Sequence, residues 1–274
     1  MRLGLVLDPR RDWASIRDEA VRAEALGFDL VWLEAGGAVT AAALAGVTRV
    51  IRVGLPFTCG PHPVLVAEES AVADLVLGGR LVVGLAVGPG GRDELTETVE
   101  VVLRGHAPRP FRHRGPRWIV PANRPANEGT ETRVRVTPTP AQLELPVWLT
   151  GPGSAGAAAE FGQTYLGASE ESAQALAASW SHIAAALGPA AARLRRPAIR
   201  ALADGAIDAA AIVESLRAER AAWGLDVALL RLPGSGRMAA LETIAHAVRP
   251  RLQLDSLPLG LDEFWSRRPT STRS

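Results

Sequence analysis

Lysine is missing from this sequence, in which all 30 basic residues are arginines. The chain therefore has no amine for Schiff-base chemistry and no lysine for a P-loop that binds phosphates. Cysteine is nearly missing as well: Cys59 is the only one, which excludes an internal disulfide and a multi-cysteine metal site. No apolar run approaches the length of about 18 residues that a membrane-spanning helix needs.

A charge excess is also lacking, because 30 basic and 29 acidic residues leave a formal net charge of +1. This balance gives no electrostatic reason to expect a nucleic acid or a membrane surface as partner. The five histidines show none of the spacings typical of a metal site, such as HxH or HExxH: His62, His106, His113, His182 and His246. From these spacings we expect no metal site. The N-terminus lacks the charged head and apolar core of a signal peptide, so we expect a cytoplasmic protein.

The sequence does contain a repeated alternation of short apolar runs and amphipathic segments. Its clearest unit has a strand (51–57), a polar break (58–62), a helix beginning at Pro63, a second strand (81–87) and a glycine-rich turn (88–91). Two buried strands joined by a covering helix form a parallel unit. Parallel strands place ligands at their carboxyl ends, which is where both turns lie.

Continued along the chain, this alternation predicts eight strands, over residues 2–7, 28–33, 51–57, 81–87, 146–150, 164–167, 197–202 and 227–232. Eight helices alternate with them, including a brief one over 93–103 and a long one capped by Ser169. We therefore predict an α/β fold, a single (β/α)8 TIM barrel formed by residues 1–250. An open doubly wound sheet is the alternative, but it would normally show GxGxxG after the first strand, where this chain has Asp8 and Pro9.

Two segments depart from the alternation. Residues 105–142 are rich in proline and arginine and predict an irregular excursion between the fourth and fifth barrel strands, with a local hairpin. A loop of this length is usually functional or mobile, and its Trp118 is the best candidate for a substrate-facing tryptophan. Residues 251–274 form a C-terminal extension that we expect to be partly disordered.

Four segments of the chain resemble the bacterial luciferase-like flavin-dependent monooxygenase family, of which this would be a short, divergent member: residues 20–34, 51–88, 136–162 and 244–252. The resemblance implies a cofactor of the flavin type, reduced FMN or alternatively coenzyme F420, lying across the carboxyl ends of the strands. It also implies a flavin reductase as partner, a small organic substrate and O2 as co-substrate. Members often form dimers through the helices near strands 2 and 3, so we expect a homodimer.

The resemblance also assigns cofactor-binding positions at three turns. In the family, the turn after strand 3 places a strained peptide beside the flavin ring, strand 4 ends beside that ring, and the turn after strand 5 binds phosphate. Glycines there allow close backbone approach, and free amides at a helix start attract phosphate. The positions implied in this chain are Thr58, Cys59, Gly60, Gly88, Gly153 and Ser154.

Three residues are the catalytic candidates. His62 occupies the family's His-Pro at the start of a helix, where it can reach the cofactor or serve only as a helix-start residue. Glu34 ends a barrel strand, where it can handle a proton or pair with a loop arginine. Cys59 is either a nucleophile or a packing residue, and packing is favoured because the sequence forces no histidine beside it.

The sequence departs from the family pattern after strand 2, where Glu34 is followed by Ala35 and Gly36 instead of two histidines. This loss motivates an alternative function, a non-catalytic flavin-binding or partner-subunit homologue. Arg200 and Arg231 fall late in the last two strands, and each can hold an anionic substrate or form an internal salt bridge.

Overall fold

The computed structural model describes residues 1–8, 10–34, 37–122, 132–151, 153–205, 207–252 and 254. Its main sheet has eight parallel strands in the order β8-β7-β4-β3-β2-β1-β10-β9. The strands are β1 (Arg2–Leu7), β2 (Leu30–Leu33), β3 (Arg52–Thr58), β4 (Leu81–Ala86), β7 (Val147–Thr150), β8 (Thr164–Leu166), β9 (Pro197–Ala201) and β10 (Val227–Arg231). A parallel bridge between Gly167 and Ala198 joins the two edges of the sheet. The predicted barrel is thus confirmed.

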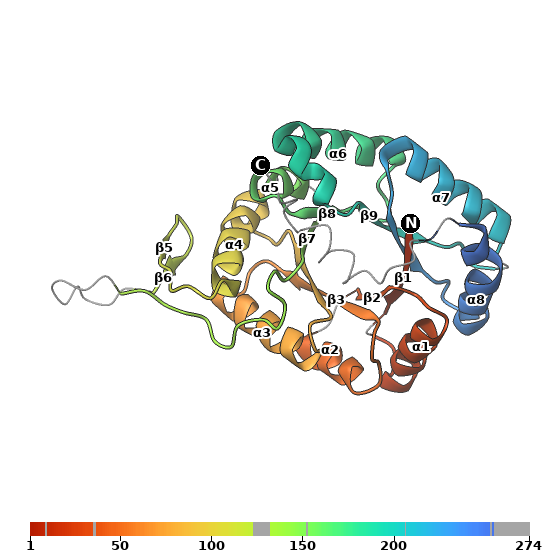
Figure 1. Ribbon diagram of the computed structural model, residues 1–274, viewed down its shortest axis with the longest axis horizontal. Helices are drawn as coiled ribbons and strands as arrows, with labels where there is room; N and C mark the ends of the chain where they lie inside the picture. Colours follow the sequence, from red (N-terminus) through yellow and green to blue (C-terminus); the bar gives the residue numbers. More distant parts are fainter. Residues whose placement is uncertain are drawn as a thin grey trace, which may run out of the picture.

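Helices alternate with the strands and surround the sheet in chain order (Figure 1). They are α1 (Trp13–Ala25), α2 (Ala38–Ala45), α3 (Pro63–Val76), α4 (Gly91–His106), α5 (Ser154–Phe161), α6 (Ala173–Leu187), α7 (Ala209–Trp223) and α8 (Arg237–Thr243). Local sequence explains their starts: Asp12 and Asp208 accept backbone N–H bonds as N-caps of α1 and α7, and Pro63 occupies the first turn of α3.

Two helix predictions were wrong in detail. The segment expected to hold a brief helix over 93–103 forms α4, which has 16 residues because its last turn continues to the buried Gly105, packed closely on Ala67 of α3. Helix α6 is capped by Ser172, whose hydroxyl accepts from the Ala175 amide, and not by Ser169. The cap moves because the Glu171 carboxylate accepts from the Ala168 amide at 2.6 Å and holds the chain in a turn before the helix.

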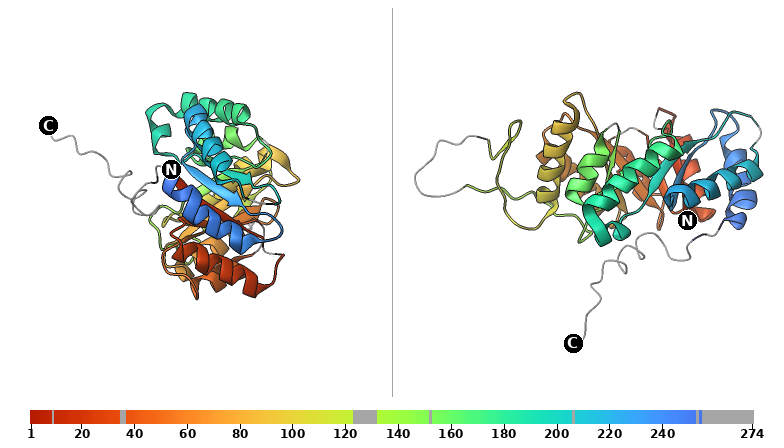
Figure 2. Two further views of the ribbon diagram at one scale, coloured as in Figure 1. Left: turned by 90° about the vertical axis from the view of Figure 1, so that its right-hand side faces the viewer. Right: turned by 90° about the horizontal axis from the view of Figure 1, so that it is seen from above.

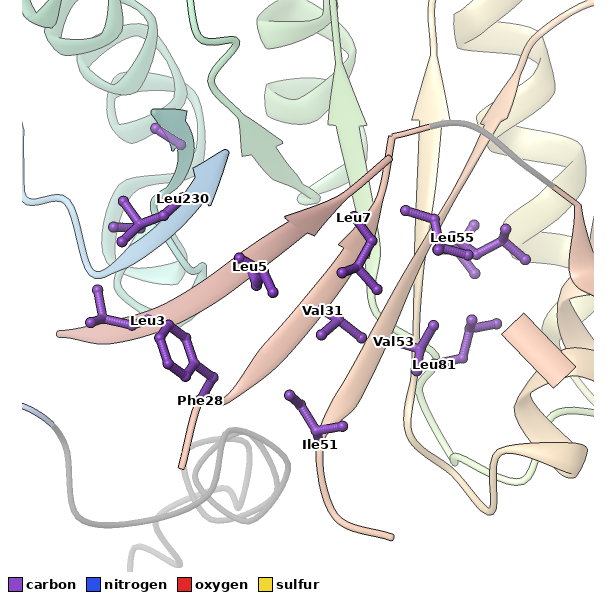
Figure 3. Close-up of a cluster of buried hydrophobic side chains, with 14 of the residues drawn as sticks. Leu3, Leu5, Leu7, Phe28, Val31, Ile51, Val53, Leu55, Leu81 and Leu230 are labelled. Atoms are coloured by element: carbon purple, nitrogen blue, oxygen red, sulfur yellow. The ribbon is translucent and has the colours of Figure 1, made fainter. Parts of the chain in front are cut away.

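Apolar side chains pack on both faces of the barrel sheet. The outer layer lies between sheet and helices, and Figure 3 shows part of it on β1–β4 and β10. The inner layer fills the barrel and includes Trp32 and Trp148, whose rings stack with centroids 5.6 Å apart. A Cβ at Gly54 would overlap the Trp32 ring, so only glycine leaves room for this pair. Both tryptophans are buried, and together we call them the tryptophan floor beneath the carboxyl ends of the strands.

The excursion contains the predicted local hairpin, formed by β5 (His113–Arg114) and β6 (Ile119–Val120). It lies outside the barrel beside α4 (Figures 1 and 2). Nearly all of the extension predicted over residues 251–274 lies outside the described residues. No helix within the described ranges is long and apolar enough to cross a membrane.

Candidate active site

The carboxyl ends of the barrel strands present a ring of partly exposed residues above the tryptophan floor. Side chains alternate along a strand, so the residues two positions beyond the inner layer also point toward the barrel axis. On β4, β7, β8 and β9 these positions carry small residues, and on β1, β2 and β10 they carry charges. The ring consists of Asp8, Glu34, Thr58, Ala86, Thr150, Ala168, Ala201 and Arg231. This face therefore has an uncharged half and a charged half.

The turns after β3 and β4 pack directly against each other. The Cys59 amide donates to the Ala86 carbonyl at 2.9 Å. A Cβ at Gly88 would overlap the carbonyl oxygen of Cys59, so residue 88 must be glycine for the two turns to meet. Gly60 has φ +146°, a conformation that favours glycine. The two turns, both predicted at the carboxyl ends of the strands, thus form one continuous wall.

Cys59 lies inside this wall and is buried. Burial raises the pKa of its thiol to about 11, so the thiol is protonated at neutral pH. A protonated, buried thiol is a poor nucleophile, which favours the packing role of Cys59 over the catalytic one.

His62 is the N-cap of α3 and is half-buried. Its Nδ1 accepts a hydrogen bond from the Val64 amide at 3.3 Å, so the neutral ring carries its proton on Nε2. The His62 ring also meets Trp118 at a centroid distance of 4.9 Å and an interplanar angle of 65°. His62 is therefore available as a hydrogen-bond donor through Nε2, beside the one tryptophan that we predicted to face the substrate.

The turn after β7 leads into α5 through Gly153, whose φ of +79° requires glycine. Ser154 is fully buried, and both its amide and its hydroxyl donate to the Gly151 carbonyl, at 3.2 and 2.8 Å. Ser154 therefore shapes the turn instead of offering donors to a ligand. The next two amides of the helix, of Ala155 and Gly156, have no partner within the helix and point toward its open end.

Arg92 adds a positive charge to this helix start. A Cβ at Gly156 would lie 2.6 Å from the Arg92 Nη2, so the guanidinium rests directly on the first turn of α5. Arg92 is exposed and makes no ion pair with the described residues. Sequence analysis missed this arginine, although a glycine inside the alanine-rich helix 154–161 is a sign of close approach.

Glu34 and Arg231 form an ion pair across the charged half of the ring, with Oε1 and Nη2 2.5 Å apart. Arg231 also donates to the Ser169 hydroxyl at 3.0 Å. Arg200 is held by a bidentate pair with Glu219 at 2.7 and 2.6 Å. Of the two alternatives left open for these arginines, the internal salt bridge is the observed state of both.

A metal site is not found in the described part of the chain, where no three His, Cys, Asp or Glu residues gather to hold an ion. The ring of small side chains, the glycine wall and the positive helix start instead suit an organic ligand that carries a phosphate. This is the arrangement of a parallel barrel that binds its ligand at the carboxyl ends of the strands.

Comparison with known proteins agrees with this class. The sequence pattern of the luciferase-like monooxygenases matches residues 1–268, so the chain belongs to that family. A search of curated protein sequences gave no significant match. Members of the family are oxidoreductases, among them monooxygenases.

Solved structures share the fold at low sequence identity. Monooxygenase RslO1 from Streptomyces bottropensis aligns over 91% of this chain and 99% of its own, with 18% identity and a TM-score of 0.69. An F420-dependent secondary alcohol dehydrogenase in complex with an F420-acetone adduct aligns over 92% and 99%, with 14% identity and a TM-score of 0.74. The oxygenating constituent of 3,6-diketocamphane monooxygenase from Pseudomonas putida, in complex with FMN, aligns over 93% and 99%, with 16% identity and a TM-score of 0.67.

Proposed function

We propose that this protein is a flavin-dependent oxidoreductase of the monooxygenase type, which uses reduced FMN and O2 to oxidise a small organic molecule. When bound, the reduced flavin supplies two electrons; one oxygen atom enters the substrate and the other leaves as water. The observation that carries this proposal is the positive helix start of α5, with Arg92 resting on Gly156 beside the small-residue half of the ring.

The residues present fit such a cofactor. At the phosphate end, the amides of Ala155 and Gly156 and the Arg92 guanidinium would bind an anion, while Gly153 and Ser154 hold the turn in shape. At the ring end, Thr58, Cys59, Gly60 and Gly88 form the wall against which a planar group would lie.

Two polar groups of this chain are proposed to handle protons. His62 would donate from Nε2 to a developing negative charge, since Nδ1 is occupied by the Val64 amide. Glu34 would accept a proton from the substrate, and its ion-pair partner Arg231 would bind the anion that remains.

The nature of the cofactor is tested by absorbance titration with FMN and with coenzyme F420, each in its oxidised form, coupled to thermal unfolding. We expect one of them to bind and to raise the melting temperature. FMN is favoured here, with reduced FMN supplied by a flavin reductase in the cytoplasm, and F420 is the alternative. Failure of both to bind contradicts the proposal.

The alternative function is a flavin-binding homologue without catalysis. It is favoured by one observation, namely that Glu34 is already paired with Arg231 and no histidine follows it in the sequence. A reductase-coupled assay separates the two: cofactor binding without turnover of O2 or substrate supports the alternative, and turnover excludes it.

A homodimer is proposed on the face formed by α2 and α3. Helix α3 exposes apolar side chains at Leu65, Val72 and Val76, with exposed fractions of 52%, 42% and 52%. Exposed apolar residues gathered on one helix face are typical of a surface that a partner covers. A second copy of the chain is the proposed partner.

A further inference from the structure

The hairpin excursion reaches the candidate site through Trp118, the residue just before β6. Its indole packs edge to face on His62, which ends the turn after β3. Hairpins that project from a barrel are usually free to move, and an aromatic residue on one would not hold a fixed orientation. The contacts of this hairpin with α4 explain why Trp118 nevertheless has a fixed orientation.

Glu97 provides most of these contacts. Its carboxylate is almost fully buried, with 7% of the side chain exposed, and it accepts from the Trp118 amide at 2.7 Å and the Arg117 amide at 3.1 Å. The Nε2 atom of the buried His113 lies 2.9 Å from the same carboxylate. One carboxylate thus holds both arms of the hairpin, through β5 and through the residues that precede β6.

Glu94 connects this hairpin to the wall of the site. One of its oxygens pairs with the Arg117 guanidinium at 2.9 Å, and the other accepts from the Gly90 amide at 3.0 Å. Gly90 belongs to the turn whose Gly88 packs on Cys59. The hairpin, the turn after β4 and the turn after β3 are therefore one connected unit.

We propose that Glu97 is a positioning residue which fixes Trp118 as an aromatic wall of the cofactor site. The inference deepens the proposed function and rests on it. Burying a carboxylate costs free energy of desolvation unless hydrogen-bond donors compensate it. If the only task of residue 97 were to pack the hairpin on α4, an apolar residue would do. Three donors directed at one carboxylate instead impose a single backbone conformation on residues 117 and 118, which sets the direction of the indole.

The positioning is measured without any cofactor by 19F NMR of protein labelled with 5-fluorotryptophan, in which Trp118→Phe assigns the Trp118 signal. We expect Glu97→Gln to move the Trp118 signal toward the solvent-exposed value while the other tryptophan signals stay in place. The matched control is Glu100→Gln: Glu100 lies one turn later on α4, pairs with Arg104 at 2.6 Å and lies 3.6 Å from the His113 Nδ1 atom of the hairpin, but it has no hydrogen bond to residues 117 and 118. An unmoved Trp118 signal in folded Glu97→Gln overturns the positioning role.

The wall is tested by adding FMN, and separately F420, to the labelled wild-type protein. We expect the cofactor that binds to shift the Trp118 signal, and both Trp118→Leu and Glu97→Gln to weaken its binding about tenfold, with Trp118→Phe close to wild type. If a cofactor binds without shifting the Trp118 signal, Trp118 is not a wall of the cofactor site, while the proposed function remains intact. If neither cofactor binds, the proposed function fails and the wall fails with it, whatever Glu97→Gln does to the free protein.

Discussion

The rings of His62 and Trp118 lie edge to face with their centroids 4.9 Å apart, although one begins a barrel helix and the other belongs to a hairpin outside the barrel. This contact joins the two segments that are least regular in sequence. It places a hydrogen-bond donor and a large apolar surface together at the face where parallel barrels bind ligands.

The first prediction separates two tasks of His62, capping α3 and donating from Nε2. Asparagine is a good N-cap without an imidazole, whereas alanine caps poorly. We expect His62→Ala to lose about 1 kcal/mol of unfolding free energy, as N-cap losses do, and His62→Asn to lose little. Both variants should lose most of the turnover, measured in the reductase-coupled assay. Full turnover of His62→Asn would show that the imidazole has no chemical task.

The second prediction concerns the contact between Gly88 and the Cys59 carbonyl. Gly88→Ala forces the turns after β3 and β4 apart, so we expect it to lower the unfolding free energy by about 1–3 kcal/mol and to weaken cofactor binding. Gly46→Ala is the control, because a Cβ there meets its nearest atom at 3.5 Å, an ordinary contact. Urea denaturation measures both variants, and equal stability of the two would disprove the close packing.

The third prediction tests the phosphate end of the site. Arg92→Ala should weaken binding of FMN by about tenfold or more, as expected for loss of a charge-assisted hydrogen bond, and leave binding of riboflavin unchanged. Arg104→Ala, at the other end of α4, removes an arginine paired with Glu100 and should change neither affinity. If the loss for riboflavin equals the loss for FMN, Arg92 does not bind the phosphate.

The fourth prediction is a pH dependence of stability. Burial lowers the pKa of His106 from 6.5 to about 4, because its imidazole lies between α3 and α4 with Nε2 2.8 Å from the Ser70 hydroxyl. The unfolded chain takes up this proton more readily than the folded chain. The unfolding free energy therefore keeps its full value above pH 6.5 and decreases, by at most about 3 kcal/mol, as the pH falls toward 4.

Urea denaturation of His106→Gln between pH 4 and pH 7 checks this assignment, and we expect a shallower pH slope than in the wild type. The exposed His246, which pairs with Glu242 at 3.2 Å, provides the control variant His246→Gln. A slope that depends on His246 and not on His106 would refute the prediction.

The fifth prediction concerns the proposed dimer. A double variant of the exposed face of α3, Leu65→Glu with Val72→Glu, should be monomeric in light scattering after size-exclusion chromatography, whereas the wild type should be a dimer. Met238→Glu is the control, since Met238 is similarly exposed, at 41%, on α8. A monomeric wild-type protein, or a dimer that survives the double variant, contradicts this assignment.

The barrel could be predicted because its cause is local. Each strand is a short apolar run, and several helices begin at residues typical of helix starts, namely Asp12, Pro63 and Asp208. The cap predicted at Ser169 lies three residues later at Ser172, because the Glu171 carboxylate accepts from the Ala168 amide and holds the chain in a turn before the helix.

The site could be predicted only in part, because its contacts link distant segments. Resemblance placed Gly88 and Gly153 at turns that the structure shows to be tight, but the assignment of all these residues to a cofactor stays a prediction. Nothing in the local sequence separates Arg92 from an ordinary surface arginine of a helix. The link between Trp118 and His62 depends on Glu97, whose burial follows from the hairpin and not from its own neighbours.

The most direct measurement of the central claim is isothermal titration of the wild-type protein with FMN, riboflavin and F420, since it tests both the ring wall and the phosphate end. The account predicts saturable binding of FMN or F420 at one molecule per chain, and weaker binding of riboflavin than of FMN if FMN is the ligand. Absence of binding by FMN and F420 alike, in folded protein, would contradict it.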